Sequence, residues 1–280
     1  MKKTIRSNLR ELGPRQLVRS IWDNWFVLTQ LVRRNITNNY SGSMLGVLWA
    51  VITPIMLLAL YTIIFGFVFR PRISQMTDTP QTSDFALRLF CGLIVFWMFA
   101  DMITKAPVVM RANASLVKKV VFPLDILIVA ELGSILFQAG INMLVFLAGA
   151  LILRIPIGWE IVLTPIVLLP YLMIVLGISW VLAAAGVVLR DVSQLMGMIS
   201  TLVLFGSPVF YSISALPEKL QQLVYLNPLT FIIESLRGLI FDHRMVDWQG
   251  IAIYYVAGML LMWLGWAFFQ KSKTIFADVL

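Results

Sequence analysis

Long uncharged apolar stretches alternate along this chain with short polar segments, and this alternation is the first guide to its structure. A helix needs about 20 apolar residues to cross a bilayer. Six stretches reach that length, some of them with one or two charged residues inside: Ser43–Phe69, Phe85–Thr104, Ile126–Leu153, Ile161–Leu189, Val192–Ala215 and Trp248–Gln270. The pattern therefore predicts an all-α membrane protein with six transmembrane helices.

The segment before the first span has a different pattern. Apolar residues recur there at nearly helical spacing, and most of the arginines lie elsewhere on the helical wheel: the apolar positions are Leu17, Ile21, Trp25, Leu28 and Val32. A helix of this kind lies in the membrane interface. We expect residues 1–42 to form a cytoplasmic amphipathic segment and residues 43–280 to form the six-span domain. A plain anchor and a mechanical element both fit the N-terminal helix.

The segment between the last two spans, residues 208–241, contains apolar pieces that are too short to cross a membrane. Its longest piece, Leu220–Ile233, holds Asn227-Pro228 in its middle, and Pro208 and Pro217 divide the rest. Irregular backbone at membrane depth is tolerated only when it is buried in protein or lines a cavity. The segment is predicted to form re-entrant helices on the extracytoplasmic side.

Composition and charge agree with a membrane protein and set its orientation. Hydrophobic residues make up 60% of the 280 residues, charged residues 13%, and the mean hydropathy is +0.88. With six spans, 15 of the 22 lysines and arginines fall on the side that holds both termini. Because cytoplasmic loops carry the excess of positive charge, both termini are predicted to be cytoplasmic.

Signatures of catalysis are missing from the sequence. It contains no Gly-Lys pair, and therefore no phosphate-binding P-loop, and no G-x-G-x-x-G motif. One cysteine, Cys91, and one histidine, His243, leave little for a metal site. The acidic residues are scattered. We therefore expect a chain that is not an enzyme, with no metal and no cofactor of its own.

A loop of residues 106–123 joins the second and third spans, on the predicted cytoplasmic side. A short helix should end before Phe122-Pro123, because the residue preceding a proline disfavours helix. Leu116, Val117, Val120 and Val121 would form its apolar face, which a partner subunit could grip. The neighbouring Lys118 and Lys119 are equally compatible with a role in orientation alone.

Charged residues inside the predicted spans need partners or water. Asp101 and Lys105 are four residues apart with the acid first, which favours an ion pair along one helix. Glu131 lies five residues inside its span, and its candidate partners are Lys105 and the basic loop.

Small and aromatic residues give further expectations. Gly42 and Gly46 form a small-xxx-small pair that allows close helix contact. Pro54 should kink its helix or leave a carbonyl free. Interface-belt positions are expected for three tryptophans, Trp22, Trp248 and Trp266.

Four stretches in this order and spacing resemble a known family. They are "RRNITNNYSGSMLGVLWAVITPIMLLALYTIIFGFVF", "LVKKVVFPLD", "LRDVSQL" and "SPVFY…LPEKLQQLVYLNPLTFIIESLRGLIF". Together they resemble the membrane-spanning permease subunit of ATP-binding cassette (ABC) exporters of bacterial polysaccharides. That group includes the O-antigen, capsule and teichoic-acid permeases, and the chain is most similar to the O-antigen branch.

The resemblance implies a partner set and a location. Such permeases are homodimers in the bacterial inner (plasma) membrane and work with two copies of a separate cytoplasmic ATPase, which binds the ATP and magnesium. Their cargo is a polysaccharide on an undecaprenyl pyrophosphate carrier, which passes through a channel along the dimer axis. No nucleic acid is involved. An ABC-type exporter of another cargo, such as a drug, a lipid or teichoic acid, is the alternative, and a secondary transporter is a more distant one.

Three groups of residues are candidates for these roles. For ATPase coupling they are Leu116, Val117, Lys118, Lys119, Val120, Phe122, Arg190 and Asp191. For the substrate entrance they are Arg33, Arg34 and Tyr40, because guanidinium groups bind phosphate oxygens in a bidentate fashion. For the channel lining they are Trp49, Phe96, Trp97, Phe99 and Tyr211, since sugars stack on aromatic faces.

Overall fold

The computed structural model describes residues 13–64, 82–117 and 122–279, and all regular structure within these ranges is helical. In chain order the elements are α2 (Pro14–Asp23), α3 (Trp25–Tyr40), η1 (Gly46–Leu48), α4 (Trp49–Ile63), α6 (Thr82–Ala112), α7 (Ala114–Val117), α8 (Asp125–Ile152), η3 (Trp159–Leu163), α9 (Thr164–Val188), α10 (Val192–Phe205), η4 (Ile213–Ala215), α11 (Glu218–Tyr225), α12 (Pro228–Phe241) and α13 (Trp248–Val279).

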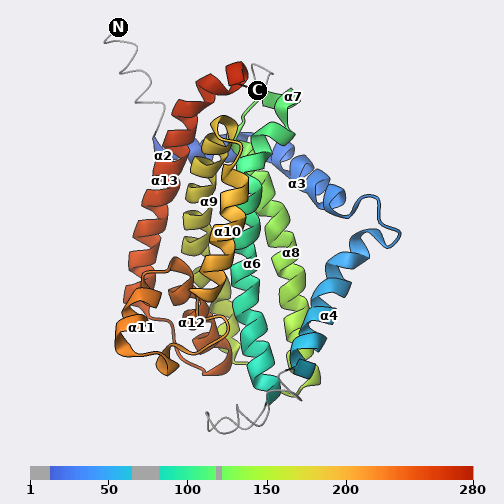
Figure 1. The fold of residues 1–280 in the computed structure, drawn as a ribbon, viewed down its shortest axis with the longest axis vertical. Helices are drawn as coiled ribbons and strands as arrows, with labels where there is room; N and C mark the ends of the chain where they lie inside the picture. The colour runs from blue at the N-terminus through green and yellow to red at the C-terminus, as the bar shows by residue number, and fades with distance from the viewer. Residues whose placement is uncertain (1–12, 65–81, 118–121, 280) are drawn as a thin grey trace.

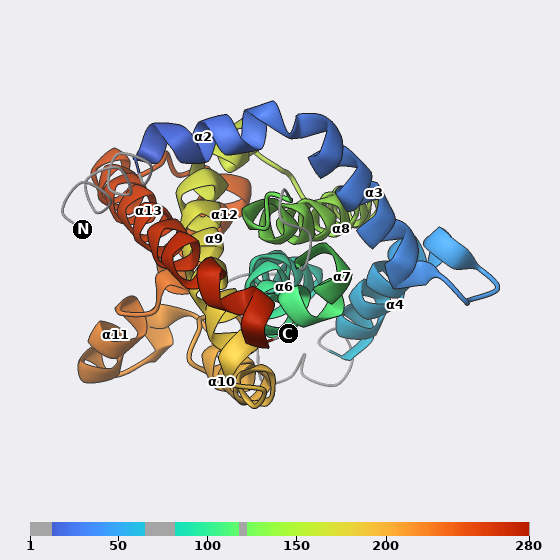
Figure 2. The ribbon, with the colours of Figure 1, turned by 90° about the horizontal axis from the view of Figure 1, so that it is seen from above.

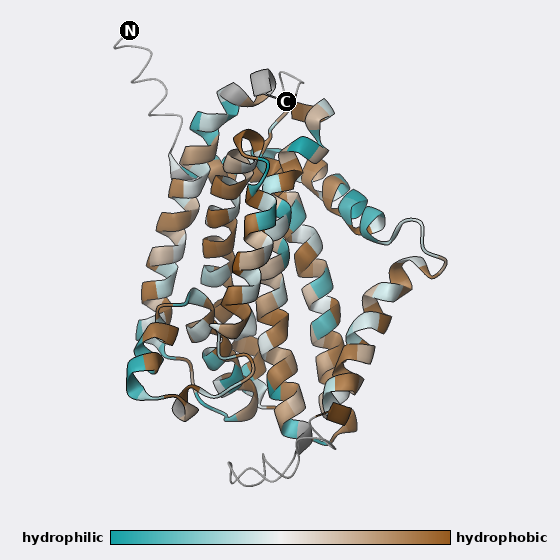
Figure 3. Cartoon of the chain, in the orientation of Figure 1, coloured by the Kyte–Doolittle hydropathy of each residue, from teal (hydrophilic) through white to brown (hydrophobic). Residues whose placement is uncertain are grey.

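Long apolar helices run side by side along the longest axis of the molecule (Figure 1). Within the described residues, five helical segments are long and apolar enough to cross a membrane, in α4, α6, α8, α9 and α13. The chain is therefore an all-α, multi-pass membrane protein, as its sequence predicts. The predicted span Ile126–Leu153 agrees with α8 to within one residue at each end. Hydrophobic residues cover α9, α10 and α13 over most of their length (Figure 3).

The predicted fifth span, Val192–Ala215, is wrong in length. Its helix, α10, ends at Phe205 after 14 residues, and the chain continues through turns to η4. Fourteen helical residues cover about 21 Å, which is less than the roughly 30 Å of the hydrocarbon core. The sequence lacks any charge up to Ala215, but Gly206, Ser207 and Pro208 end the helix early.

The proline-divided segment forms two helices, α11 and α12, that meet at an angle of 100°. Both lie at the end of the bundle opposite α2 and α7 (Figure 1). Asn227 caps α12 by accepting a hydrogen bond from the Leu229 amide at 3.0 Å. The Arg237 guanidinium then fixes α12 to its neighbours through the carbonyl oxygens of Arg88 (3.0 Å) and Val209 (2.7 Å). The predicted pair of short helices is thus present, and α12 is largely buried.

The N-terminal segment forms two helices rather than one, since the expected helix breaks at Asn24. α2 and α3 curve around the outside of the bundle (Figure 2). Leu17 and Leu28 are buried in the core, so the predicted apolar face packs against the spans. Trp25 lies on the same apolar side as Leu28 and Val32, and its side chain is 60% exposed, as an interfacial tryptophan can be.

Glycines set the closest helix contacts, although not the pair that the sequence suggested. Gly42 and Gly46 have φ values of +87° and +52°, and a Cβ at either would meet no atom within 4 Å. They allow the turn between α3 and α4 rather than a helix contact. At the crossing of α9 and α13, by contrast, a Cβ on Gly265 would lie 2.1 Å from the Gly177 carbonyl oxygen.

Trp266 does not occupy the interface belt that its place near the end of a span suggested. Its side chain is 2% exposed and lies inside the bundle, whereas Trp22 and Trp248 are exposed. Trp266 sits on the face of α13 that packs toward α8 and α2, because its indole nitrogen donates to Asp125 at 3.2 Å.

Candidate functional site

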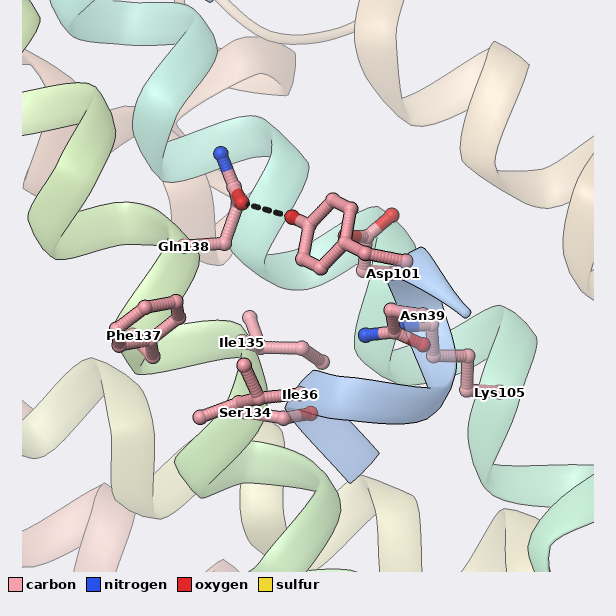
Figure 4. A pocket seen from close by; sticks show the side chains of 9 residues that line it. Ile36, Asn39, Asp101, Lys105, Ser134, Ile135, Phe137 and Gln138 are labelled. Atoms are coloured by element: carbon pink, nitrogen blue, oxygen red, sulfur yellow. Dashed lines mark hydrogen bonds between the residues drawn. The ribbon is translucent and has the colours of Figure 1, made fainter. Parts of the chain in front are cut away.

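A polar pocket lies where α3, α6 and α8 meet (Figure 4). Its volume is about 280 Å³, and it is lined by Ile36, Asn39 and Tyr40 of α3, Asp101 and Lys105 of α6, and Ser134, Ile135, Phe137 and Gln138 of α8. The residues of α6 and α8 belong to helices that are otherwise strongly apolar. Placing an ionisable group in a membrane-spanning helix costs free energy, so such groups are candidates for a functional role.

The charged pair beside this pocket joins two helices. Lys105 of α6 contacts Glu131 of α8 at 3.2 Å, and the Asn35 amide of α3 donates to the other Glu131 oxygen at 2.9 Å. Lys105 is thus the partner that Glu131 needed. The predicted ion pair between Asp101 and Lys105 is wrong, because Lys105 bonds across to α8 rather than along its own helix.

The carboxylate of Asp101 is left without an ion pair or hydrogen bond in the part of the chain that the structure describes. Nearby, burial raises the pKa of the Tyr40 hydroxyl above its ordinary value, and the negative charge of Asp101 raises that pKa further. Tyr40 therefore remains a hydrogen-bond donor at neutral pH. The pocket offers both a charged acceptor and neutral polar groups, a combination that suits hydroxyl-rich ligands.

Pro54 explains why a glutamine stands in the wall of the pocket. A proline inside a helix leaves the carbonyl four residues earlier without its N–H donor. The Gln138 amide of α8 donates to that carbonyl, the oxygen of Ala50, at 3.0 Å. The Tyr40 hydroxyl in turn donates to Gln138 Oε1, the hydrogen bond marked in Figure 4. The free carbonyl predicted at Pro54 thus ties α4 to α8 and α3.

The three predicted entrance residues are separated by the structure. Tyr40 lines the polar pocket. Arg34 donates to the Asn113 side chain at 2.8 Å, and so links α3 to the junction of α6 and α7. Arg33 lines a separate apolar groove between α3 and α8.

The predicted coupling residues that the structure describes are not all exposed. Val117, at the end of α7, is 6% exposed and part of the core, and Leu116 and Phe122 are half-buried. The expectation that Val117 projects as an apolar patch is therefore wrong for the protomer, because α7 turns this side chain inward. Lys118, Lys119 and Val120 lie outside the described residues, as does Val121.

Arg190 and Asp191 are exposed in the turn between α9 and α10. This turn lies at the same end of the bundle as α7 (Figure 1). Arg111, near the end of α6, donates to the Arg190 carbonyl at 3.5 Å, so the two predicted coupling regions are neighbours.

Two of the five channel-lining candidates are buried within the protomer. Phe96 and Phe99 are 6% and 8% exposed and pack in the core, which favours a role in helix packing over a place in a channel wall. The sequence of one uniformly apolar helix does not reveal which of its side chains are buried against other helices. Trp97 and Tyr211 are partly exposed, and Trp49 is 40% exposed.

Sequence reasoning passed over Asp125, which the structure places at a junction. This buried carboxylate accepts hydrogen bonds from the Ser20 hydroxyl of α2 at 2.8 Å and from the Trp266 indole of α13 at 3.2 Å. Its carbonyl accepts another from Trp180 of α9. The signal was available, since Asp125 stands at the first position of an apolar run and directly after the Pro123-Leu124 pair.

Comparisons with known proteins agree on one family. Residues 27–241 match the family described as ABC-2 type transporter. The chain is 26% identical over 269 residues to the O-antigen export system permease protein RfbA of Myxococcus xanthus, covering 94% of this chain and 98% of that protein. It is also 26% identical over 256 residues to a Klebsiella pneumoniae protein of the same name, covering 91% and 95% of the two chains.

Proposed function

The chain belongs to the ABC-2 type transporter family, and from this premise we propose that it exports a lipid-linked polysaccharide such as O-antigen. The carrier would be undecaprenyl pyrophosphate, and the energy would come from a separate ATPase that binds ATP and magnesium. The observation that carries the proposal is the polar pocket at the meeting of α3, α6 and α8, in a chain that resembles O-antigen permeases over more than nine-tenths of its length.

The chemistry of the pocket supports a sugar as its ligand. Asp101 and Tyr40 line it together with Asn39 and Gln138. These groups can bind sugar hydroxyls, which both donate and accept hydrogen bonds. A purely hydrophobic drug would leave the Asp101 carboxylate without a partner in a site of reduced water, which is costly.

Two exposed apolar surfaces are available to a second copy of the chain. Only 17% of the residues in the α4 span are buried, and α10 exposes Met198, Leu202 and Phe205. We infer that a second copy of the chain covers part of these surfaces and that Trp49 and Tyr211 face the channel between the copies. Both termini would be cytoplasmic and the membrane would be the bacterial inner membrane, in agreement with the excess of positive charge on that side.

Asp101→Asn should lower polysaccharide export at least about tenfold, since a hydrogen bond to a charged group contributes roughly 1.5–3 kcal/mol and each 1.4 kcal/mol corresponds to a factor of ten. The substitution keeps the volume of the side chain and removes its charge. Export is measured as polymer on the outer leaflet of cells that express the chain with its cognate ATPase. Membrane insertion and ATPase assembly are verified in the same cells.

Asp23→Asn serves as the matched control. Asp23 is an exposed carboxylate on α2 that pairs with Arg19 at 3.2 Å and does not line the pocket. The Asp23→Asn variant should export the polysaccharide at the wild-type rate. Undiminished export by Asp101→Asn would show that the pocket does not bind the sugar during export. If the protein exported only a sugar-free amphiphile, the alternative cargo would be favoured.

Arg190→Glu should reduce co-purification of the ATPase about tenfold, because it reverses a charge on the exposed turn that we assign to coupling. Surface substitutions usually change stability by less than about 0.5 kcal/mol, so the protomer itself should remain folded. Lys219→Glu makes the same reversal on an exposed lysine of α11, at the opposite end, and should leave the complex intact. Equal recovery of the ATPase with both variants would place the coupling surface elsewhere.

A further inference from the structure

An apolar groove runs along most of α3, where this helix packs against α8. Its volume is about 480 Å³, and its lining residues are Trp25, Leu28, Thr29, Val32, Arg33, Ile36 and Thr37 of α3 with Val129, Leu132, Gly133 and Leu136 of α8. Gly133 lets the two helices approach, because a Cβ there would lie 2.6 Å from a methyl carbon of Val32. The groove is wide enough to hold a stretch of hydrocarbon chain.

The groove and the polar pocket lie on different sides of α8. The groove is lined by Val129, Gly133 and Leu136, and the pocket by Ser134 and Gln138. At 100° per residue these two sets fall on nearly opposite faces of one helix. Residues of α6 line the pocket but not the groove, which therefore opens toward the outside of the bundle.

Among the described residues that line the groove, Arg33 alone carries a charged side chain. The hydroxyls of Thr29 and Thr37 donate to carbonyl oxygens of α3 itself, at 2.8 and 2.9 Å, so they need no further partner. The Arg33 guanidinium has no hydrogen bond or ion pair within residues 13–64, 82–117 and 122–279. Its neighbour Arg34, in contrast, is held by Asn113.

The surroundings of the groove place it at the depth of lipid headgroups. α2 and α3 run around one end of the bundle, across the direction of the spans (Figures 1 and 2). Trp22, Trp25 and Phe26 are 79%, 60% and 74% exposed on these helices. Exposed tryptophans of this kind are enriched at the membrane–water interface.

We propose that this groove is a binding site for one anionic phospholipid of the surrounding bilayer. One acyl chain lies along Leu132, Gly133 and Leu136, and the phosphate binds the Arg33 guanidinium. An acyl chain that moves from the bilayer into the groove gains only packing, so the headgroup decides which lipid binds. Phosphatidylcholine also carries a phosphate, but its choline ammonium offsets that charge, whereas the net negative charge of an anionic headgroup remains available to Arg33. The lipid would hold α3 on α8, next to the Asn35–Glu131 hydrogen bond, and this role does not depend on the cargo.

Trp25 is a built-in reporter for the test, because it lines the groove. The full-length protein is placed in zwitterionic nanodiscs and titrated with phosphatidylglycerol or phosphatidylcholine that carries brominated acyl chains, which quench tryptophan fluorescence at short range. The part of the signal that disappears with Trp25→Phe belongs to the groove. We expect saturable quenching of Trp25, with about tenfold tighter half-saturation for phosphatidylglycerol than for phosphatidylcholine.

Arg33→Gln should remove this preference, and Arg15→Gln should keep it. Arg15 is an exposed arginine of α2 that does not line the groove. Both variants therefore lose one positive charge, but only Arg33→Gln loses it in the groove. Equal quenching by both lipids in the wild type would overturn the proposal, as would an unchanged preference in Arg33→Gln. Tighter binding of a polyprenyl phosphate than of phosphatidylglycerol would also overturn it, since the groove would then hold the cargo's own lipid.

Discussion

Gly265→Leu is expected to lower strongly both the yield and the melting temperature of the folded protein. A Cβ at Gly265 of α13 would lie 2.1 Å from the carbonyl oxygen of Gly177 in α9, and the other nearest atoms are also backbone atoms of Gly177. Gly177 is itself held close, since its own Cβ would meet the carbonyl of Leu261 at 2.4 Å. The backbone cannot rotate away as a side chain does, so α9 and α13 would have to move apart to make room for the new side chain.

Overpacking a core costs about 1–3 kcal/mol when side chains can adjust, and we expect at least the upper end of this range here. The matched control is Gly140→Leu, at a glycine of α8 whose Cβ would meet nothing within 4 Å. That substitution should be neutral or stabilising by up to about 1 kcal/mol, because glycine is a poor helix former. Fluorescence-detected size-exclusion chromatography and the melting temperature in detergent separate the two. Comparable yields and Tm values would show that α9 and α13 do not depend on this contact.

Lys105→Met is expected to destabilise the protein more than Glu131→Leu does. Breaking one partner of a buried ion pair typically costs 3–5 kcal/mol, and we expect about 3 kcal/mol for Lys105→Met because this pair is partly hydrated. The Glu131 side chain is 13% exposed and would lose its cationic partner in a site that admits little water. Asp101, whose negative charge also acts on this site, would add to the cost.

Glu131→Leu leaves a different charge behind. The Lys105 side chain is 35% exposed, so its ammonium group can reach water or the polar pocket. The double variant Lys105→Met/Glu131→Leu should recover much of the lost stability, since it leaves no unpaired charge between α6 and α8. Chemical or thermal unfolding of the four proteins gives the coupling energy. Additive losses in the double variant would mean that the two side chains do not stabilise each other.

The positions of most helices along the chain could be predicted from the sequence alone. The length of an apolar run is a local property, and the thickness of the bilayer converts it into a span. The sequence thus determined α8 to within one residue, the start of α13 at Trp248, and the two short helices α11 and α12. It also determined that Pro54 frees a carbonyl, because a proline lacks its donor wherever it stands.

The rotation and crossing of the helices decided the rest, and these depend on packing between segments distant in the chain. An apolar helix has no strong stripe to mark its buried side, so Phe96 and Phe99 could not be distinguished from Trp97 in advance. Arg33 and Arg34 are neighbours in sequence, yet a 100° turn sends one toward the groove and the other toward Asn113. The partner of Glu131 and the backbone contact at Gly265 likewise exist only where two helices meet, and only the tertiary structure brings them together.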